Sequence, residues 1–298
     1  MSKSKNNLGK YVGFSTDWSF KFYFGREENK TVLISFLNGL FAGQKVIKDL
    51  NYRSVEHDGD IEEDRRVVFD LYCICENGEH IIIEMQQVSQ DFFKDRTVFY
   101  TSRLINRLVS KGYKGNSYEL PEVYFIGVLE FKFEDAEPDK YLYDVALCDK
   151  ENNSVFYEKL GYKLLVLPNF NKEGADIKTD MDQWLYLLKN LSKLDKIPSF
   201  LDKRIFGLIF DIGEVAKLKT EDKMNYEASL KRKRDAESIR LTQERIARER
   251  EQNALEKGME KGMELEKRAL AIKFKGMGIS IKDIAKGTGL SIEEIEKL

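Results

Sequence analysis

Two runs of strand-forming residues joined by a short turn constrain this chain more than any other feature. They extend over residues 64–90 and meet at residues 76–78, Glu-Asn-Gly. Apolar, β-branched runs on either side of an Asn-Gly pair are typical of a β-hairpin. Each run carries a carboxylate where a core strand is normally apolar, Asp70 in the first and Glu84 in the second. A buried charge is costly unless it is paired or binds a metal, so these two acids need an explanation.

The length of the turn decides whether the two acids share a face of the hairpin. A two-residue Asn77-Gly78 loop would place Asp70 and Glu84 on opposite faces, because side chains alternate along a strand. A three-residue loop, with Gly78 in the left-handed conformation and a bulge after it, places Asp70 directly across from Glu84. Their β-carbons would then be about 5 Å apart. Gln86 shares that face, and this set of oxygen donors suits a hard cation such as Mg2+, or Mn2+.

A purely structural interpretation competes with the metal site. An isolated acid in a strand often lies on a solvated face or pairs with a nearby Lys or Arg. The residues around the two acids leave neither face of the hairpin clearly polar, which favours a functional site. These neighbours are Val68, Tyr72, Ile82 and Ile83.

The same residues resemble a known nuclease family. Residues 69–70 (Phe-Asp) and 84–86 (Glu-Met-Gln), with a helix expected before and after, look like the PD-(D/E)XK nuclease fold in the form found in recombination-promoting nucleases and related transposases. The start of the chain resembles that family too, in residues 17–25, in Asn-Lys at 29–30 and in Leu-Asn-Gly-Leu at 37–40. The resemblance covers most of the chain, including its C-terminal part.

The resemblance implies an α/β fold with a PD-(D/E)XK restriction-endonuclease-like core, a small mixed sheet flanked by helices, and a C-terminal helical extension. It implies Asp70, Glu84, Gln86 and Asp17 as catalytic residues, with Asp70 and Glu84 as metal ligands. The sequence departs from the family name by having Phe69 in place of proline and Gln86 in place of lysine. Glutamine is usual at this place in this family. For Asp17, an N-cap of the first helix is the plain structural alternative.

The composition limits how the chain can contact nucleic acid and metal. Its 298 residues are 42% apolar, enough for one sizeable core with an appendage. A formal charge of −2 excludes a uniformly basic surface, so contact with phosphate must come from local patches. With three cysteines, two histidines and no Cys-x-x-Cys pair, a zinc site is not expected. No apolar run is long enough for a signal core or a membrane span, which predicts a cytoplasmic protein without membrane contact.

The rest of the N-terminal region mixes helical and strand patterns. The strands and helices do not alternate strictly, which favours a small-sheet α/β fold over a doubly wound one. We expect helices over residues 17–41, 91–111, 179–191 and 200–219, strands over residues 45–55, 122–131, 141–147 and 162–167, and loops over residues 57–64 and 112–121.

One expected helix carries a stripe of basic and aromatic side chains. Arg96, Tyr100, Arg103 and Arg107 are spaced by four, three and four residues, so they lie on one helix face. Guanidinium groups on the helix that follows the metal strand could hold DNA phosphates beside the cleavage point. An ordinary solvated face with surface arginines is the alternative.

The composition changes near residue 221 and predicts three parts. These are a nuclease-like domain over residues 1–220, a long charged helix or linker over 221–268, and a small helix-turn-helix-like tail over 269–298. The charged part has a basic start that could touch nucleic acid, with a plain solvated face as the alternative.

Two features of the C-terminal parts bear on assembly. A near-repeat of Glu-Lys-Gly-Met at 256–259 and 260–263 would let two helices approach closely, which predicts a homo-oligomer formed through residues 221–298. A flexible linker is the alternative. In the tail, capping sequences begin at Ser280 and Ser291 on either side of a glycine turn. The second tail helix is acidic, which favours packing over base reading.

Two functions remain open at this point. The first is a metal-dependent DNA endonuclease that promotes recombination in a transposase-like manner, with Mg2+ or Mn2+ as cofactor and DNA as partner. The second is a catalytically inactive nuclease-fold interaction protein that assembles through its C-terminal helices. A glycoside hydrolase with two carboxylates is less favoured, because no aromatic sugar platform is expected near them.

Overall fold

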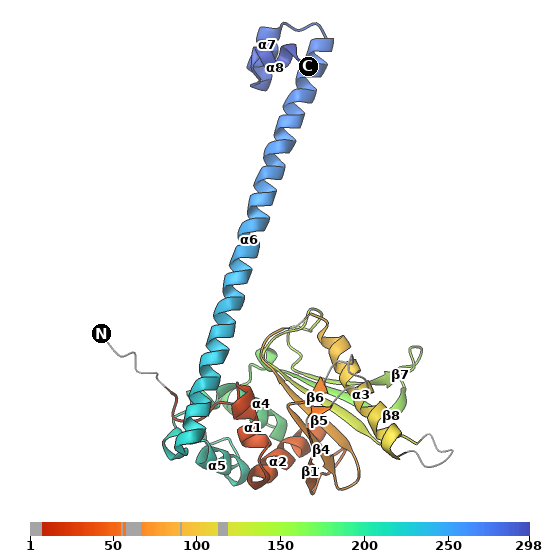
Figure 1. Cartoon of the computed structure of the whole chain (residues 1–298), viewed down its shortest axis with the longest axis vertical. Helices are drawn as coiled ribbons and strands as arrows, with labels where there is room; N and C mark the ends of the chain where they lie inside the picture. Colours follow the sequence, from red (N-terminus) through yellow and green to blue (C-terminus); the bar gives the residue numbers. More distant parts are fainter. Residues whose placement is uncertain (1–7, 55, 58–66, 90, 113–118) are drawn as a thin grey trace, which may run out of the picture. The chain divides into compact units, whose positions relative to one another are not determined.

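The computed structural model describes residues 8–54, 56–57, 67–89, 91–112 and 119–298, and places a mixed sheet of six strands at the centre of the N-terminal region (Figure 1). The order across this sheet is β1-β4-β5-β6-β8-β7. Strands β5, β6 and β8 run parallel, whereas β1, β4 and β7 are antiparallel to their neighbours. The strands are β1 (Leu50–Tyr52), β4 (Leu71–Cys75), β5 (His80–Gln86), β6 (Val123–Leu129), β7 (Leu142–Cys148) and β8 (Val155–Val166), with a separate pair β2 (Glu56–His57) and β3 (Val67–Val68).

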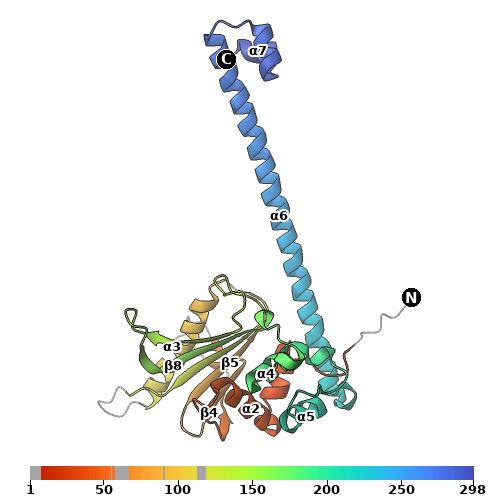
Figure 2. The ribbon, with the colours of Figure 1, turned by 180° about the vertical axis from the view of Figure 1, so that it is seen from behind.

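Helices cover both faces of this sheet. The helix α3 (Phe93–Gly112) lies on one face, and four shorter helices lie on the other (Figure 2). The four are α1 (Asp17–Phe24), α2 (Lys30–Phe41), α4 (Asp180–Asn190) and α5 (Lys203–Ile212). Short 3-10 turns occupy Glu27–Asn29, Leu167–Asn169, Gly174–Asp176, Leu191–Lys193 and Val215–Lys217. This arrangement confirms the predicted α/β class with a small mixed sheet flanked by helices.

Alternation along the central strands produces the two cores. In β5, Ile81 and Ile83 pack toward the four-helix layer, whereas Ile82 packs toward α3. Successive side chains of a strand point to opposite faces, so a strand buried on both faces reads as a continuous apolar run. The two cysteines of β4, Cys73 and Cys75, are likewise buried. Glu84 is the acid that interrupts this apolar pattern inside β5.

Two expected helices end at glycines that closely approach distant segments. The expected helix over residues 17–41 breaks at Gly25, where an added β-carbon would lie 2.8 Å from the Leu71 side chain. The expected helix over residues 200–219 is shorter, because α5 ends at Ile212 with Gly213 as its C-cap, and a side chain at position 213 would overlap the Tyr23 hydroxyl. Such contacts are not visible in local sequence periodicity.

Other expected elements differ in length. The strand expected over residues 45–55 is limited to β1, and the one expected over 162–167 is extended in β8 because β7 pairs along it. The expected loop over 57–64 lies, apart from its first residue, outside the described residues, as does most of the loop expected over 112–121. The strand expected over residues 122–131 is present as β6.

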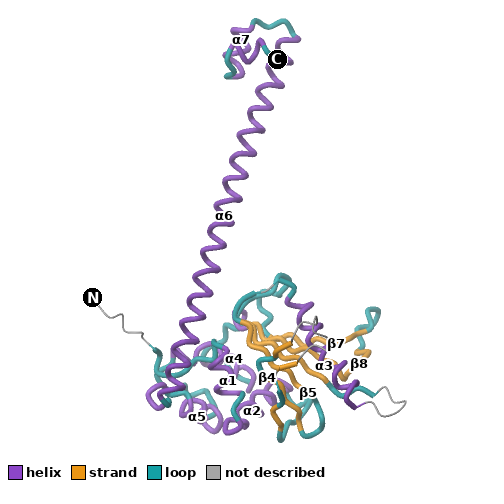
Figure 3. Tube along the Cα trace, in the orientation of Figure 1, coloured by secondary structure: helices purple, strands orange, loops and turns teal. Residues whose placement is uncertain are grey.

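The C-terminal region is helical (Figure 3). It consists of α6 (Thr220–Gly276), α7 (Ile281–Thr288) and α8 (Ile292–Glu296). Contacts divide the chain into two compact units, Met1–Lys231 and Arg232–Leu298. The first turns of α6 belong to the first unit, where the Ser229 hydroxyl donates to the Thr16 hydroxyl. The predicted division into three domains stays a prediction.

The second unit has a small core of its own. Ala271, Ile284, Leu290 and Ile295 are buried together. Ser280 and Ser291 cap α7 and α8 as expected, and Gly289 ends α7 with a φ of 75°. Elsewhere in this unit, α6 is largely exposed, and ion pairs four residues apart support such a solvated helix. None of the helices that the structure describes combines the length and apolarity that crossing a membrane requires.

Candidate active site

The hairpin of β4 and β5 has the register that the three-residue turn predicts. Leu71 pairs with Ile83 in the antiparallel ladder. Gly78 has a φ of 91°, the left-handed conformation that closes such a turn. This pairing ends at Leu71, so Asp70 lies one residue beyond the ladder, beside Glu84 of β5. The register of the turn therefore brings the two acids to the same end of the hairpin.

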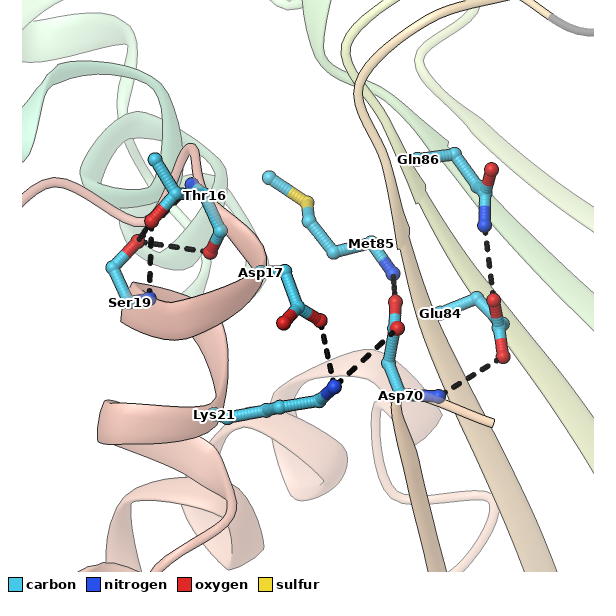
Figure 4. A network of polar contacts seen from close by, with 8 residues as sticks. All are labelled: Thr16, Asp17, Ser19, Lys21, Asp70, Glu84, Met85 and Gln86. Carbon is cyan, nitrogen blue, oxygen red and sulfur yellow. Dashed lines mark hydrogen bonds and ion pairs between the residues drawn. The ribbon is translucent and has the colours of Figure 1, made fainter. Parts of the chain in front are cut away.

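Asp70 lies at a bend immediately before β4. Its side chain accepts a hydrogen bond from a main-chain N–H of the neighbouring strand β5. The same pairing would set Phe69 opposite Met85, but Phe69 lies outside β4 and is buried on the α3 side of the sheet. The Met85 N–H donates instead to Asp70 Oδ2 at 2.7 Å (Figure 4). In return, the Asp70 N–H donates to Glu84 Oε1 at 3.1 Å. These two hydrogen bonds fix both carboxylates where the start of β4 meets the end of β5.

Burial shifts the titration of both acids in the same direction. Glu84 is only 2% exposed, and burial together with the charge of Asp70 raises the pKa of Glu84 to about 8. Burial also raises the pKa of Asp70 to about 6, although the Met85 N–H opposes this shift and the Asp17 carboxylate adds to it. Gln86 donates its amide to Glu84 Oε2 at 2.9 Å. A buried acid beside a half-buried acid is typical of a site that accepts positive charge.

Helix α1 brings a third acid and a lysine to this place. Thr16 caps the helix by accepting the Ser19 N–H, so Asp17 is the first helical residue, and the interpretation of Asp17 as the N-cap is wrong. Lys21 Nζ lies 2.7 Å from Asp17 Oδ1 and 4.0 Å from Asp70 Oδ1 (Figure 4). The structure thus groups Asp17 with Asp70, as the family resemblance implied.

Lys21 is the residue of this group that the sequence analysis missed. Its only local signal is its position one helical turn after Asp17, which an ordinary surface ion pair also explains. It reaches the acids because α1 packs beside the start of β4. Lys21 therefore places a positive charge beside Asp17 and Asp70.

Helix α3 contributes from the opposite side of the acids. The guanidinium of Arg96 lies 4.8 Å from the centre of the Tyr100 ring, and its charge opposes the rise in the pKa of Glu84. Burial raises the pKa of Tyr100, and the charges of Glu84 and Asp70 add to this rise. The structure therefore brings two of the four predicted stripe residues near the acids. The other two are half-buried further along the helix, at positions 103 and 107.

The donor chemistry fits a hard divalent cation. Asp70 and Glu84 supply two neighbouring carboxylates, whereas the Asp17 carboxylate is paired with Lys21. Carboxylate oxygens are the ligands that Mg2+ and Mn2+ prefer. Within the described part of the chain, His, Cys, Asp and Glu side chains do not form a group of three or more that could hold a metal ion. A metal site here would therefore depend on the pair Asp70 and Glu84.

Comparison with known proteins identifies a family for the chain. The family model described as PD-(D/E)XK nuclease family transposase matches residues 14–242, which include the whole sheet, both acids and helix α3. No curated protein and no solved structure shows a significant match to the chain. The match covers more than half of the chain and begins just before helix α1. The chain therefore belongs to the PD-(D/E)XK nuclease family of transposases.

Proposed function

We propose that this protein is a metal-dependent DNA endonuclease that promotes recombination. The observation that carries the proposal is a pair of hydrogen bonds, from the Asp70 N–H to Glu84 and from the Met85 N–H to Asp70, which hold two acids with raised pKa values at one point of the sheet. Membership of a nuclease family supports phosphodiester hydrolysis as the reaction. The same arrangement would be unfavourable as a purely structural element, because a buried acid and a half-buried acid that repel each other destabilise the fold.

In this proposal each side chain of the site has a role. Asp70 and Glu84 would hold Mg2+ or Mn2+, which when bound would lower the pKa of a water molecule and balance charge on the scissile phosphate. Gln86 fixes the orientation of Glu84 and would orient the attacking water. Lys21, positioned by Asp17, and Arg96 would supply the fixed positive charge beside the phosphate.

DNA binding would extend along helix α3 from the acids. Arg96 and Tyr100 lie near Glu84, and Arg103 and Arg107 continue the stripe. Guanidinium groups bind phosphate oxygens in a bidentate manner and position a duplex without reading its sequence. We propose these four side chains as the phosphate contacts of the nuclease.

Assembly is a further part of the proposal. Leu255, Met259 and Met263 are spaced by four residues on α6 and are 64%, 60% and 54% exposed. Residues at this spacing share a helix face, and Gly258 and Gly262 lie beside them without any atom near an added β-carbon. We propose that this face binds a second copy of the chain, since an exposed apolar stripe on a charged helix is typical of a helix–helix contact.

Nicking of supercoiled plasmid tests the nuclease proposal. With Mg2+ or Mn2+, Asp70→Asn and Glu84→Gln should each lower the rate by about 100-fold or more, as removal of one charge-stabilising group in an active site typically does. Asp211→Asn is the matched control, because Asp211 is 79% exposed on α5. Equal nicking by all four proteins, or none by any of them, would refute the proposal and favour the inactive interaction protein.

A further inference from the structure

A hollow at the start of helix α3 is walled by exposed phenylalanines. Its volume is about 490 Å3, and it is lined by Asp91, Phe92, Asp95, Arg96, Phe99 and Tyr100. Phe92 is 78% exposed and Phe99 is 43% exposed. Exposed aromatic area is unfavourable in water, so two such rings around one hollow point to a ligand that covers them.

The backbone holds Phe92 in a conformation that a bulky residue rarely adopts. Its φ is 61°, in the left-handed region, and its carbonyl accepts the Arg96 N–H at 3.0 Å as helix α3 begins. Phe92 also lines a second hollow, of about 900 Å3, whose wall includes Phe133 and Lys132. The ring therefore borders two spaces at once. Strain of this kind in an exposed aromatic residue is typical of a binding position rather than of a packing position.

The smaller hollow adjoins the candidate active site. Tyr100, which forms part of its wall, packs against Phe69 with 5.6 Å between the ring centres, and Phe69 directly precedes Asp70. An occupant of the hollow would therefore lie near the acids proposed to cut DNA. This continuity makes a part of the DNA substrate the natural occupant.

The lining suits an unpaired nucleobase better than a phosphate. Phenylalanine rings offer flat faces on which a base can stack. Asp91 and Asp95 can accept hydrogen bonds from base amino groups but would repel a phosphate, whereas Arg96 at the edge can hold the adjoining phosphate. A base inside a duplex has both of its faces covered by stacking, so the hollow can take only an unpaired or extruded base.

We propose that Phe92 and Phe99 bind an unpaired base of the DNA substrate, and that the enzyme acts on DNA that carries a single-stranded extension or junction. This inference rests on the proposed nuclease function and names its substrate class. It assigns Phe92 and Phe99 as substrate-binding residues that determine specificity.

Binding of two matched DNAs to the full chain in EDTA tests this inference apart from cleavage. One DNA is a blunt duplex, and the other has the same duplex with a short single-stranded extension. Fluorescence anisotropy should show about tenfold tighter binding of the extended DNA, as one base–aromatic stack provides. Phe92→Ala and Phe99→Ala should reduce this preference to about threefold or less, whereas Phe92→Tyr should keep it. Phe156→Ala, at a residue 81% exposed on β8, is the matched control and should also keep it.

A photochemical measurement separates direct stacking from an indirect structural effect. With 5-iodouracil in the extension, irradiation should crosslink the DNA to Phe92 or Phe99. The inference would be overturned by equal affinity of the wild type for both DNAs, or by an unchanged preference in Phe92→Ala and Phe99→Ala. Crosslinks only to residues other than Phe92 and Phe99 would also overturn it. A preference for the extended DNA without any cleavage in Mg2+ would keep the base-binding role of Phe92 and Phe99 while refuting the nuclease. Cleavage that depends on Asp70, without any preference for the extended DNA, would support the nuclease and refute the base-binding role.

Discussion

Glu84 is the residue whose environment makes the sharpest prediction. Its pKa is raised by burial and by the charge of Asp70, so the folded chain binds a proton more tightly than the unfolded chain does. For an acid with a raised pKa, the free energy of unfolding falls as pH rises from the unfolded value toward the folded one. We expect the metal-free protein to lose on the order of 2 kcal/mol between about pH 5 and about pH 8.

The neutral isostere Glu84→Gln should flatten this pH profile and make the metal-free protein more stable than the wild type near pH 8. Addition of Mg2+ should then stabilise the wild type more than the variant, because only the wild type presents both carboxylates. Urea unfolding across this pH range, with EDTA or with Mg2+, measures both effects, and Asp211→Asn serves as the control. A wild-type profile that rises toward pH 8 without metal would contradict the assignment of a buried, protonatable Glu84.

At the scale of residues, local chemistry predicted that Asp70, Glu84 and Gln86 lie close together, from strand alternation and the glycine turn. The structure joins them by hydrogen bonds to Glu84 from the Asp70 N–H and the Gln86 amide, although Asp70 lies just outside β4. Lys21 could not be found, because its approach to Asp70 depends on how α1 packs beside β4. The exposed ring of Phe92 was equally hidden, since its φ of 61° follows from the path of the chain into α3.

At the scale of elements, the hairpin turn should be sensitive to a single β-carbon. Gly78 has a φ of 91° with open space around it, so Gly78→Ala strains the backbone without any clash. We expect a loss of about 1–2 kcal/mol in the free energy of unfolding, measured by urea denaturation. Gly207→Ala, in helix α5 and also in open space, should instead be neutral or stabilising by up to about 1 kcal/mol. A similar response at both positions would mean that Gly78 is not needed for the register.

The elements that the sequence predicted well are those with strong local patterns. Strand β6 and helix α4 follow apolar runs and a Thr179 capping box that depend on neighbouring residues alone. Elements whose ends depend on distant contacts were predicted less well. Helix α5 ends at Ile212, and its C-cap Gly213 has no room for a side chain beside Tyr23 of another segment. Strand β8 is lengthened by its pairing with β7.

At the scale of the whole molecule, the proposed pairing of α6 predicts an oligomer in solution. Sedimentation equilibrium of the full chain should give a dimer or a larger species. Introducing charge with Met259→Lys and Met263→Lys together should shift it toward the monomer, because both side chains lie on the proposed contact face. Met224→Lys, at an exposed methionine of the first unit, should leave the mass unchanged. A monomeric wild type at the same concentration would refute the pairing.

The central claim is that Asp70 and Glu84 together hold a divalent cation. Anomalous diffraction from a crystal of the full chain soaked in Mn2+ measures this most directly, because it locates the ion without relying on activity. We predict an anomalous peak bounded by the two carboxylates, and its loss in Asp70→Asn. An occupied Mn2+ site elsewhere with none at these acids, or the same peak in the variant, would contradict the account.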